Sequence, residues 1–486
     1  MRQNFEKQKS EGEAKGSPAG GPKSNARKAV LTEGPIGKTL FSLTVPMTMG
    51  ILAMVAFNLT DTFFVSRLGT KHLAALSFTF PVILVLTRFA LGIGVGAASV
   101  VSRAIGMGDW KEVRRLTTDG LGLSLFFVAI FVVAGLFSID RVFGALGADG
   151  EILGLVREYM RIWYFGLIFV VVPMVSNNAI RATGDTKTPA MIMLVAVVVN
   201  TVLDPLLIFG IGPFPEMGLA GAALATLIAR MVTFAVSFYV IYKKLKMMTF
   251  ERPGFDEMID SWKRILYIAL PAAVTRIIVP IGQGVITGIT AAYGTNAVAA
   301  LGVAIRTEYF AFAVIMALSS VLAPFVGQNW GAGKFDRVRV GIRKSNRFAM
   351  AWGFGSFAVL ALVARPVARV FSGDPEVISN IVLYLRIVPL AYFLQMVLML
   401  VTGTLNVLNK PFHAAAMGMG QVILLTIPFA FIGSAIFGLK GVFMGIAAAY
   451  LISGIFAQTV LWKQVRQVEE DANGTVKDTG GFYGQK

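Results

Sequence analysis

The chain has 486 residues, of which 56% are apolar and only 15% are charged, and its mean hydropathy is +0.70. A soluble domain carries about a quarter charged residues, so most of this chain is predicted to lie in a lipid bilayer. Cysteine is absent and the only histidines are His72 and His413, which excludes disulfides, thiolate metal sites and a zinc or haem site. The net charge of +17 comes largely from short loops beside apolar stretches, a pattern typical of membrane topology and not of nucleic-acid binding.

Residues 1–38 form a polar stretch without an apolar core and are predicted to be a disordered cytoplasmic tail. After this tail, apolar stretches of about 20 residues, long enough to cross a bilayer core, recur along the chain. Twelve transmembrane helices are predicted, at about 39–65, 72–99, 117–138, 160–181, 189–210, 218–242, 265–292, 297–325, 346–366, 381–407, 412–436 and 440–462. A cytoplasmic linker, 246–264, separates a first half, 39–245, from a second half, 265–463, and a cytoplasmic tail, 464–486, follows. The predicted fold class is an all-α polytopic membrane protein.

Basic residues alternate between the predicted loops. Three loops are rich in them, those after the second helix (Arg103, Lys111, Arg114, Arg115), the sixth (Lys243, Lys244, Lys246, Arg252, Lys263, Arg264) and the eighth (Lys334, Arg337, Arg339, Arg343, Lys344, Arg347). Residues 211–217 and 293–296 contain no Lys or Arg. Because cytoplasmic loops carry the excess of basic residues, both termini are predicted to lie in the cytoplasm.

The first two predicted helices of each half, with the loops beside them, match without a gap at an offset of 225 residues. The matched residues are Pro46 with Pro271, Gly69 and Thr70 with Gly294 and Thr295, Ala74, Ala75 and Leu76 with Ala299, Ala300 and Leu301, Gly106 and Gly108 with Gly331 and Gly333, and Val113 and Arg114 with Val338 and Arg339. Because six helices separate the copies, both halves have the same orientation. The repeat therefore predicts two pseudo-symmetric six-helix bundles about a central cleft, as in many transporters.

Two carboxylates break this symmetry. Asp61 in the first predicted helix is matched by Ile286 at the offset of 225. In the fifth predicted helix Pro205 corresponds to Pro428, which places Ile427 opposite Asp204. A carboxylate within a membrane costs several kcal/mol unless it is solvated, neutralised or paired. An ionisable residue present in only one half therefore indicates function.

Polar partners are predicted beside both acids. Asn58 precedes Asp61 by three residues and Asn200 precedes Asp204 by four, so each amide shares a helical face with its carboxylate, and Thr226 could reach the same depth. Such oxygens suit a shared proton or a sodium ion, because burial favours the neutral acid and hard cations prefer oxygen ligands. In the alternative interpretation, an intramembrane arginine such as Arg88 or Arg230 pairs with an acid and holds helices together.

Other candidates lie in the second half and in the first helix. Glu308 is interpreted as either a second coupling carboxylate or half of a structural ion pair with a nearby arginine such as Arg306 or Arg276. Pro46, in the first helix, is a candidate hinge, whereas the match to Pro271 favours a shared role at helix entry. The predicted substrate cavity is lined by Phe57, Asn58, Gln283 and Arg306.

Four segments together resemble the MATE (multidrug and toxic compound extrusion) family of transporters. They are FNLTDTFFVSRLGT at 57–70, RATGDTKTP at 181–189, NTVLDP at 200–205 and VGQNWGAGKFDRV at 326–338. The resemblance covers nearly the whole chain after residue 38 and implies a V-shaped pair of six-helix bundles.

The prokaryotic DinF-like branch of that family is most similar. The resemblance implies that Asp61 and Asp204 are its first-lobe acids, with Asn178, Asn200 and Thr226 at matching polar positions, and that Pro46 is where the first helix bends. Phe57 departs from the branch, which often has Tyr there, and Glu308 matches a second-lobe acid of other branches.

What this resemblance implies, together with the repeat and the two unmatched carboxylates, is the hypothesis of a secondary active exporter, not an enzyme, in a prokaryotic inner membrane. By alternating access it would antiport amphipathic or cationic drugs against H⁺ or Na⁺, with no cofactor, no bound metal beyond Na⁺ and no nucleic-acid partner, as a monomer. A lipid-linked saccharide flippase is the main alternative, because Arg88, Arg276 and Arg306 could bind a phosphate headgroup. An intramembrane enzyme lacks the expected His, Cys or paired-acid motifs, and an ion channel fits a large repeat less well.

Overall fold

The computed structural model describes residues 29–68, 70–251 and 254–478, and within them every regular element is helical. The first half contains η1 (Val30–Thr32), α2 (Ile36–Ser66), α3 (Thr70–Met107), α4 (Trp110–Ala145), α5 (Gly150–Ala182), α6 (Lys187–Phe209), α7 (Gly218–Tyr239) and η2 (Val240–Lys244). The second half contains α8 (Phe255–Ala291), α9 (Thr295–Gly331), α10 (Phe335–Phe371), α11 (Pro375–Ile387), η3 (Val388–Ala391), α12 (Tyr392–Val407), α13 (Pro411–Gly420), η4 (Gln421–Thr426) and α14 (Ile427–Asp478).

Eleven helical segments of the described chain are long and apolar enough to cross a membrane. The last of them, Pro411–Gln467, contains two of the predicted helices, 412–436 and 440–462. Between these two, Phe437 and Gly438 have non-helical backbone angles. A Cβ on Gly445, after these two residues, would collide with the carbonyl of Phe429, before them. The chain therefore reverses direction at Phe437 and Gly438. The eleven segments therefore accommodate the twelve predicted helices.

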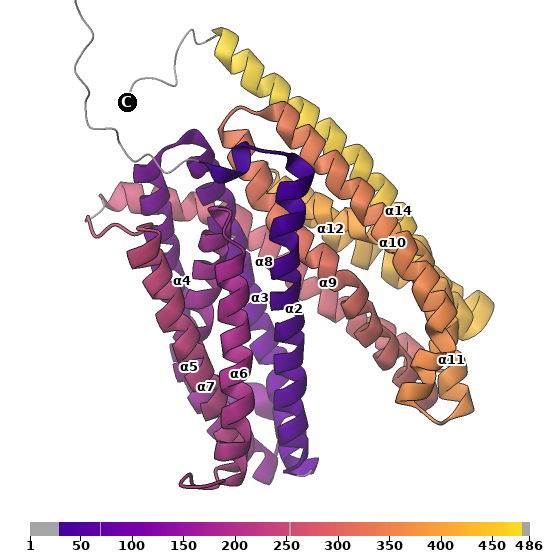
Figure 1. The fold of residues 1–486 in the computed structure, drawn as a ribbon. Helices are drawn as coiled ribbons and strands as arrows, with labels where there is room; N and C mark the ends of the chain where they lie inside the picture. The colour runs from indigo at the N-terminus through magenta and orange to yellow at the C-terminus, as the bar shows by residue number, and fades with distance from the viewer. Residues whose placement is uncertain (1–28, 69, 252–253, 479–486) are drawn as a thin grey trace, which may run out of the picture.

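Two helical bundles form the molecule (Figure 1). Helices α2 to α7 build the first and α8 to α14 the second, and the bundles meet near the end where α2 begins and α14 ends and diverge toward the other end. The largest apolar core lies mainly in the second bundle and includes Leu40 and Met47 of α2. Two smaller cores lie mainly in the first bundle, and one of them includes Ile265 and Ile268 of α8, so apolar contacts also join the bundles. The architecture is the V-shaped arrangement of two bundles expected from the repeat.

The expected domain boundaries differ from the ends of the folded segments. Residues 1–28 of the expected tail lie outside the described residues, but its last part is folded: Leu31 is 1% exposed and α2 begins at Ile36. The expected linker, 246–264, contains the start of α8, and the expected C-terminal tail, 464–486, contains the last turns of α14 up to Asp478. Hydropathy reveals only the part of each helix that lies in lipid, which is why the polar ends were assigned to tails.

Two glycines matched by the repeat allow the bundles to cross closely. A Cβ on Gly106 of α3 would collide with the carbonyl oxygen of Gln328 in α9, and a Cβ on Gly331 of α9 would collide with that of Arg103 in α3. Each helix thus presents a glycine to the backbone of the other. The repeat has kept both members of this contact, which fixes the two bundles together at this end.

Replacing Gly331 by Ala is therefore expected to destabilise the protein by about 1–3 kcal/mol, because the added methyl group has no space against the α3 backbone. The matched control is Gly302→Ala in the same helix, where a Cβ would meet no atom within 4 Å. That variant is expected to be as stable as the parent or up to about 1 kcal/mol more stable. Thermal unfolding of both variants in detergent checks this, and equal midpoints for the two would contradict the close crossing.

Candidate functional site

Three helices of the first bundle each contribute a pair of residues four positions apart to one polar cluster. The pairs are Phe57 and Asp61 on α2, Asn200 and Asp204 on α6, and Thr226 and Arg230 on α7. Residues four apart lie on the same face of a helix, so each pair presents both side chains in one direction. We call these six residues the acid cluster.

Asp204 is the most deeply buried part of the acid cluster. Asp204 and Asn200 are both 0% exposed. The amide of Asn200 donates to Asp204 Oδ1 at 3.0 Å and lies 3.5 Å from Thr226 Oγ1. The second carboxylate oxygen of Asp204, Oδ2, and the amide oxygen of Asn200, Oδ1, are both buried without a hydrogen-bond partner. Since buried polar atoms are nearly always paired, these two acceptors indicate a place for a proton, a cation or water.

Asp61 of α2 is the second carboxylate of the acid cluster. Its carboxylate interacts electrostatically with both Asp204 and Arg230. The Arg230 guanidinium stands over the Phe57 ring at 4.8 Å, and its Nε is buried without a partner. Within the described residues, no Lys or Arg nitrogen lies within 4.0 Å of either carboxylate. The structure therefore does not show the direct ion pair of the alternative interpretation.

Tyr159 of α5 is a member of the site that sequence reasoning missed. It is 5% exposed, and its hydroxyl is within electrostatic range of both Asp61 and Asp204. In the sequence, the only feature that could have identified Tyr159 is its polar hydroxyl within an apolar helix. A hydroxyl is thus supplied from α5, in a cluster where Phe57 lacks one.

The remaining predicted first-half residues lie differently. Asn178 donates to the Met174 carbonyl at 2.7 Å and accepts from Arg181 at 2.6 Å, which places it in a separate polar group on α5. The side chain of Asn58 lies outside the described residues. In the second half, Gln283 is half-buried on α8 and Arg306 is exposed on α9. No hydrogen bond between described atoms joins either of these two to the acid cluster.

Three arginines form a second group where α3, α5 and α8 meet. A Cβ on Gly92 of α3 would touch Ala273 of α8, and one on Gly96 would reach Ile265, so the helices pack antiparallel. This register places Arg88 and Arg276 at one level, and the two side chains interact electrostatically. Arg181 of α5 in turn interacts with Arg276. We call Arg88, Arg181 and Arg276 the arginine group.

The arginine group has no carboxylate partner among the described residues. The nine ion pairs of the described chain involve none of its three members. Within the described residues, its one side-chain hydrogen bond is the one that Arg181 donates to Asn178. Ionisable residues inside membranes are rare and are normally paired or line a pathway. An anion at this position would supply the missing negative charge.

Glu308 of α9 occupies a buried polar site of its own. It is 8% exposed and accepts from the hydroxyls of Tyr384 at 2.9 Å and Tyr450 at 3.3 Å. Tyr392 lies within electrostatic range, and its hydroxyl is buried without a partner. In the described chain no Lys or Arg nitrogen lies within 4.0 Å of Glu308, so the expected ion pair is not observed. The two tyrosines provide neutral donors instead.

Replacing Tyr384 by Phe is expected to destabilise the protein by about 1–3 kcal/mol, because one oxygen of a buried carboxylate loses its donor. The control is Tyr267→Phe on α8, whose ring is 44% exposed and whose hydroxyl removal should have little effect. Thermal unfolding in detergent measures both. A Tyr384→Phe protein as stable as the Tyr267→Phe protein would contradict the assigned role.

Both repeated prolines lie inside their helices. Pro46 lies nearly three turns into α2, which begins at Ile36, and Pro271 lies still further along α8, which begins at Phe255. The interpretation that they mark helix entry is therefore wrong. Pro46 removes one backbone hydrogen bond within α2, the helix that carries Asp61, and so supplies a point where that helix can bend.

The motif at 326–338 closes the end where the bundles meet. Gln328 donates to the Ala182 carbonyl of the first bundle at 2.7 Å, and its oxygen accepts from the Leu31 amide at 3.0 Å. Asn329 donates to the Leu31 carbonyl at 3.0 Å. Arg337 adds bonds to the carbonyls of Glu33 and Gly34. The segment before α2 is thus held against α9 and both bundles.

The family model MatE matches this chain twice, at residues 46–206 and 271–432, and its copies begin at the repeated prolines. The chain belongs to the MATE family of transporters. Members of this family are transporters and not enzymes, so the predicted class of protein and the predicted V-shaped helical fold are confirmed.

Relatives with assigned names support a role in moving small molecules. The chain is 37% identical to the FAD transporter of Shewanella oneidensis over 92% of this chain and 98% of that protein. It is 27% identical to the multidrug export protein MepA of Staphylococcus haemolyticus, over 88% and 94%. The Vibrio cholerae MATE transporter VcmN in its bent form superposes with a TM-score of 0.85 at 27% identity, over 90% of this chain and 98% of that one. These relatives are bacterial multi-pass membrane proteins.

Proposed function

We propose that this transporter exports an organic phosphate of the flavin dinucleotide type and couples its movement to entry of H⁺ or Na⁺ at the acid cluster. The observation that carries the choice of substrate is the arginine group, three arginines at the meeting of α3, α5 and α8 with no carboxylate partner in the described chain. A cationic substrate would be repelled there. A phosphate-bearing substrate would be attracted.

FAD fits this requirement chemically. Its pyrophosphate bridge carries two negative charges, and guanidinium groups bind phosphate oxygens through paired, charge-assisted hydrogen bonds. Arg88 and Arg276 lie at one level of two adjacent helices, so one pyrophosphate can contact both. The 37% identical relative named as an FAD transporter supports the same substrate class.

The acid cluster is proposed to couple the ion. Asp204 Oδ2 and Asn200 Oδ1 are adjacent acceptors without partners, and either a proton on the carboxylate or a sodium ion between the oxygens would satisfy them. Binding of the ion removes a negative charge beside Asp61 and Arg230, and so changes the forces between α2, α6 and α7. If the ion-bound state has lower affinity for the substrate, ion entry and substrate release are linked.

A second candidate is export of amphipathic cationic drugs, as the MepA relatives' names and the two buried carboxylates favour. Here Asp61 and Asp204 would attract the drug as well as the coupling ion. A lipid-linked saccharide would also satisfy the arginine group through its phosphate. The three candidates differ in the charge of the substrate and in whether it carries a lipid.

Equilibrium binding to the purified protein separates the candidates. FAD is expected to bind at least about tenfold more tightly than riboflavin, which shares the isoalloxazine ring and lacks phosphate, a difference of about 1.4 kcal/mol. Raising the salt concentration should weaken FAD binding and leave riboflavin binding unchanged. Equal affinity for FAD and riboflavin, together with tight binding of ethidium, would favour the drug exporter and contradict the proposal.

A further inference from the structure

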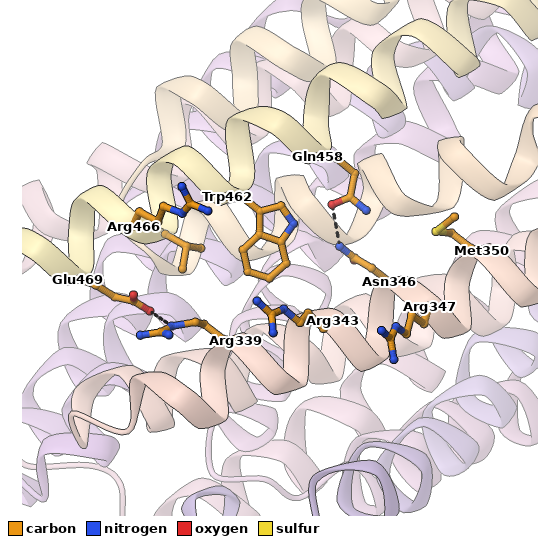
Figure 2. Close-up of a pocket in the computed structure, with 10 residues that line it drawn as sticks. Arg339, Arg343, Asn346, Arg347, Met350, Gln458, Trp462, Arg466 and Glu469 are labelled. Carbon is orange, nitrogen blue, oxygen red and sulfur yellow. Dashed lines mark hydrogen bonds and ion pairs between the residues drawn. The ribbon is translucent and has the colours of Figure 1, made fainter.

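A basic groove lies between the first half of α10 and the last part of α14 (Figure 2). Figure 1 shows these two helices side by side at the end of the molecule where α2 begins and α14 ends. Its volume is about 560 Å³. Four arginines line it, three at successive turns of α10 and one on α14: Arg339, Arg343, Arg347 and Arg466. This groove is far along the chain from the acid cluster and is not part of the proposed transport site.

The arginines of the groove are held in place but mostly not neutralised. Arg339 donates to Glu469 at 2.8 Å. Arg343 lies over the Trp462 ring at 5.3 Å, which fixes its guanidinium at the wall of the groove (Figure 2). Arg347 and Arg466, like Arg343, have no carboxylate within 4.0 Å in the described part of the chain. The groove thus keeps a surplus of positive charge.

Asn346 provides a second feature that points to a ligand. It lines the groove, is 4% exposed, and donates to Gln458 Oε1 at 3.4 Å. Its own Oδ1 is buried without a hydrogen-bond partner. A ligand that combines a phosphate for the arginines with a hydroxyl donor for this oxygen would satisfy both needs.

The internal repeat shows that this basic stripe is not part of the common scaffold. At the offset of 225 residues, Arg339 is matched by Arg114, but Arg343 is matched by Thr118 and Arg347 by Gly122. Only the second half has acquired the stripe. The same reasoning that identifies Asp61 and Asp204 as functional therefore applies to Arg343 and Arg347.

The surroundings of the groove match a lipid. Beside the groove and just beyond it toward the middle of each helix, both helices expose large apolar side chains, among them Phe348 and Trp352 on α10 and Ile455 and Phe456 on α14. A lipid whose headgroup lies in the groove would therefore place its acyl chains beside an apolar surface. Basic pockets between transmembrane helices on the cytoplasmic side are a recurrent form of lipid headgroup site.

We propose that the groove between α10 and α14 binds the headgroup of an anionic phospholipid with a free hydroxyl, such as phosphatidylglycerol. The phosphodiester lies between Arg343, Arg347 and Arg466, and a glycerol hydroxyl donates to Asn346 Oδ1. The lipid joins α10 to α14 at the edge of the second bundle and stabilises their contact.

The test measures lipid binding to the purified protein by native mass spectrometry and by thermal unfolding, with phosphatidylglycerol, phosphatidylcholine and inorganic phosphate as probes. The variant is Arg343→Gln with Arg347→Gln, and the control is Arg114→Gln, an exposed arginine at the repeat position of Arg339. Phosphatidylglycerol should bind and stabilise the parent and the control, and the double variant should bind it at least about tenfold less tightly. Phosphatidylcholine and phosphate should have little effect.

Three results would overturn the proposal. Equal binding of phosphatidylcholine and phosphatidylglycerol would show that the groove does not select charge. Equal binding of phosphatidylglycerol to the double variant and the parent would place the lipid elsewhere. Stabilisation by inorganic phosphate equal to that by phosphatidylglycerol would make the groove a site for a soluble anion.

Discussion

Replacing Asp204 by Asn is expected to abolish ion-driven transport, with a loss of at least about a hundredfold in the initial rate in proteoliposomes. Asn has nearly the shape of protonated Asp and keeps the contact with Asn200, but it cannot release a proton or hold Na⁺ with a full charge. The carboxylate is 0% exposed and its Oδ2 has no partner, so loss of its charge should not unfold the protein. The variant is expected to fold and to bind substrate, but an imposed ion gradient should not drive transport by it.

The control for this variant is Asp140→Asn on α4, a carboxylate that pairs with Arg157 at 2.9 Å and is 61% exposed. Exposed ion pairs contribute little to the stability of a protein, so the transport rate of Asp140→Asn should match that of the parent. The two variants change the same chemical group at a buried and an exposed position. If Asp204→Asn protein with a normal unfolding midpoint transports at the parent rate under an imposed ion gradient, Asp204 is not the coupling residue.

Replacing Arg276 by Gln is expected to weaken FAD binding and transport by about 10- to 100-fold, because a hydrogen bond to a charged group contributes about 1.5–3 kcal/mol. Removal of Arg276, which repels both Arg88 and Arg181, should at the same time leave the fold intact. Riboflavin binding, which lacks the phosphate contact, should be unchanged. Arg276→Lys should recover part of the loss, since lysine keeps the charge but not the paired geometry.

The matched control is Arg365→Gln, which removes an exposed arginine of α10 away from the three helices of the arginine group. It lowers the net charge of the protein by the same amount and should leave FAD binding unchanged. An Arg276→Gln protein that binds FAD as tightly as Arg365→Gln would remove the arginine group from the substrate site. A parallel loss of FAD and riboflavin binding would indicate a change of shape and not of charge.

The fold could be predicted from the sequence to a large extent, because a helix in lipid requires a long apolar stretch. The ends of the helices could not be predicted. Helix α4 runs from Trp110 to Ala145, whereas hydropathy predicts 117–138, and α10 runs from Phe335 to Phe371, whereas hydropathy predicts 346–366. The extra turns carry polar residues and lie at helix ends, where hydropathy gives no signal. The folded segment around Leu31 could not be predicted either, since the backbone N–H and C=O of Leu31 are bound by side chains of distant residues, Gln328 and Asn329.

The acid cluster could be predicted in part. Asn200 and Asp204 are four residues apart, and helical periodicity alone brings them together, as the 3.0 Å bond shows. The neighbourhood of Tyr159 and the acids depends on how α5 rotates against α2 and α6, which periodicity does not determine. The arginine group could not be predicted from the sequence for a related reason. Its members come from three helices, and only the glycine-mediated approach of α3 to α8 reveals that two of them share a level.

The most direct test of the account is accumulation of FAD in proteoliposomes of the purified protein, with an imposed proton or sodium gradient as the only source of energy. The account predicts that FAD accumulates above its external concentration while one of the two gradients lasts, and that an ionophore for that ion abolishes the accumulation. The account is contradicted if FAD does not accumulate under either gradient, and most clearly if ethidium accumulates in the same vesicles.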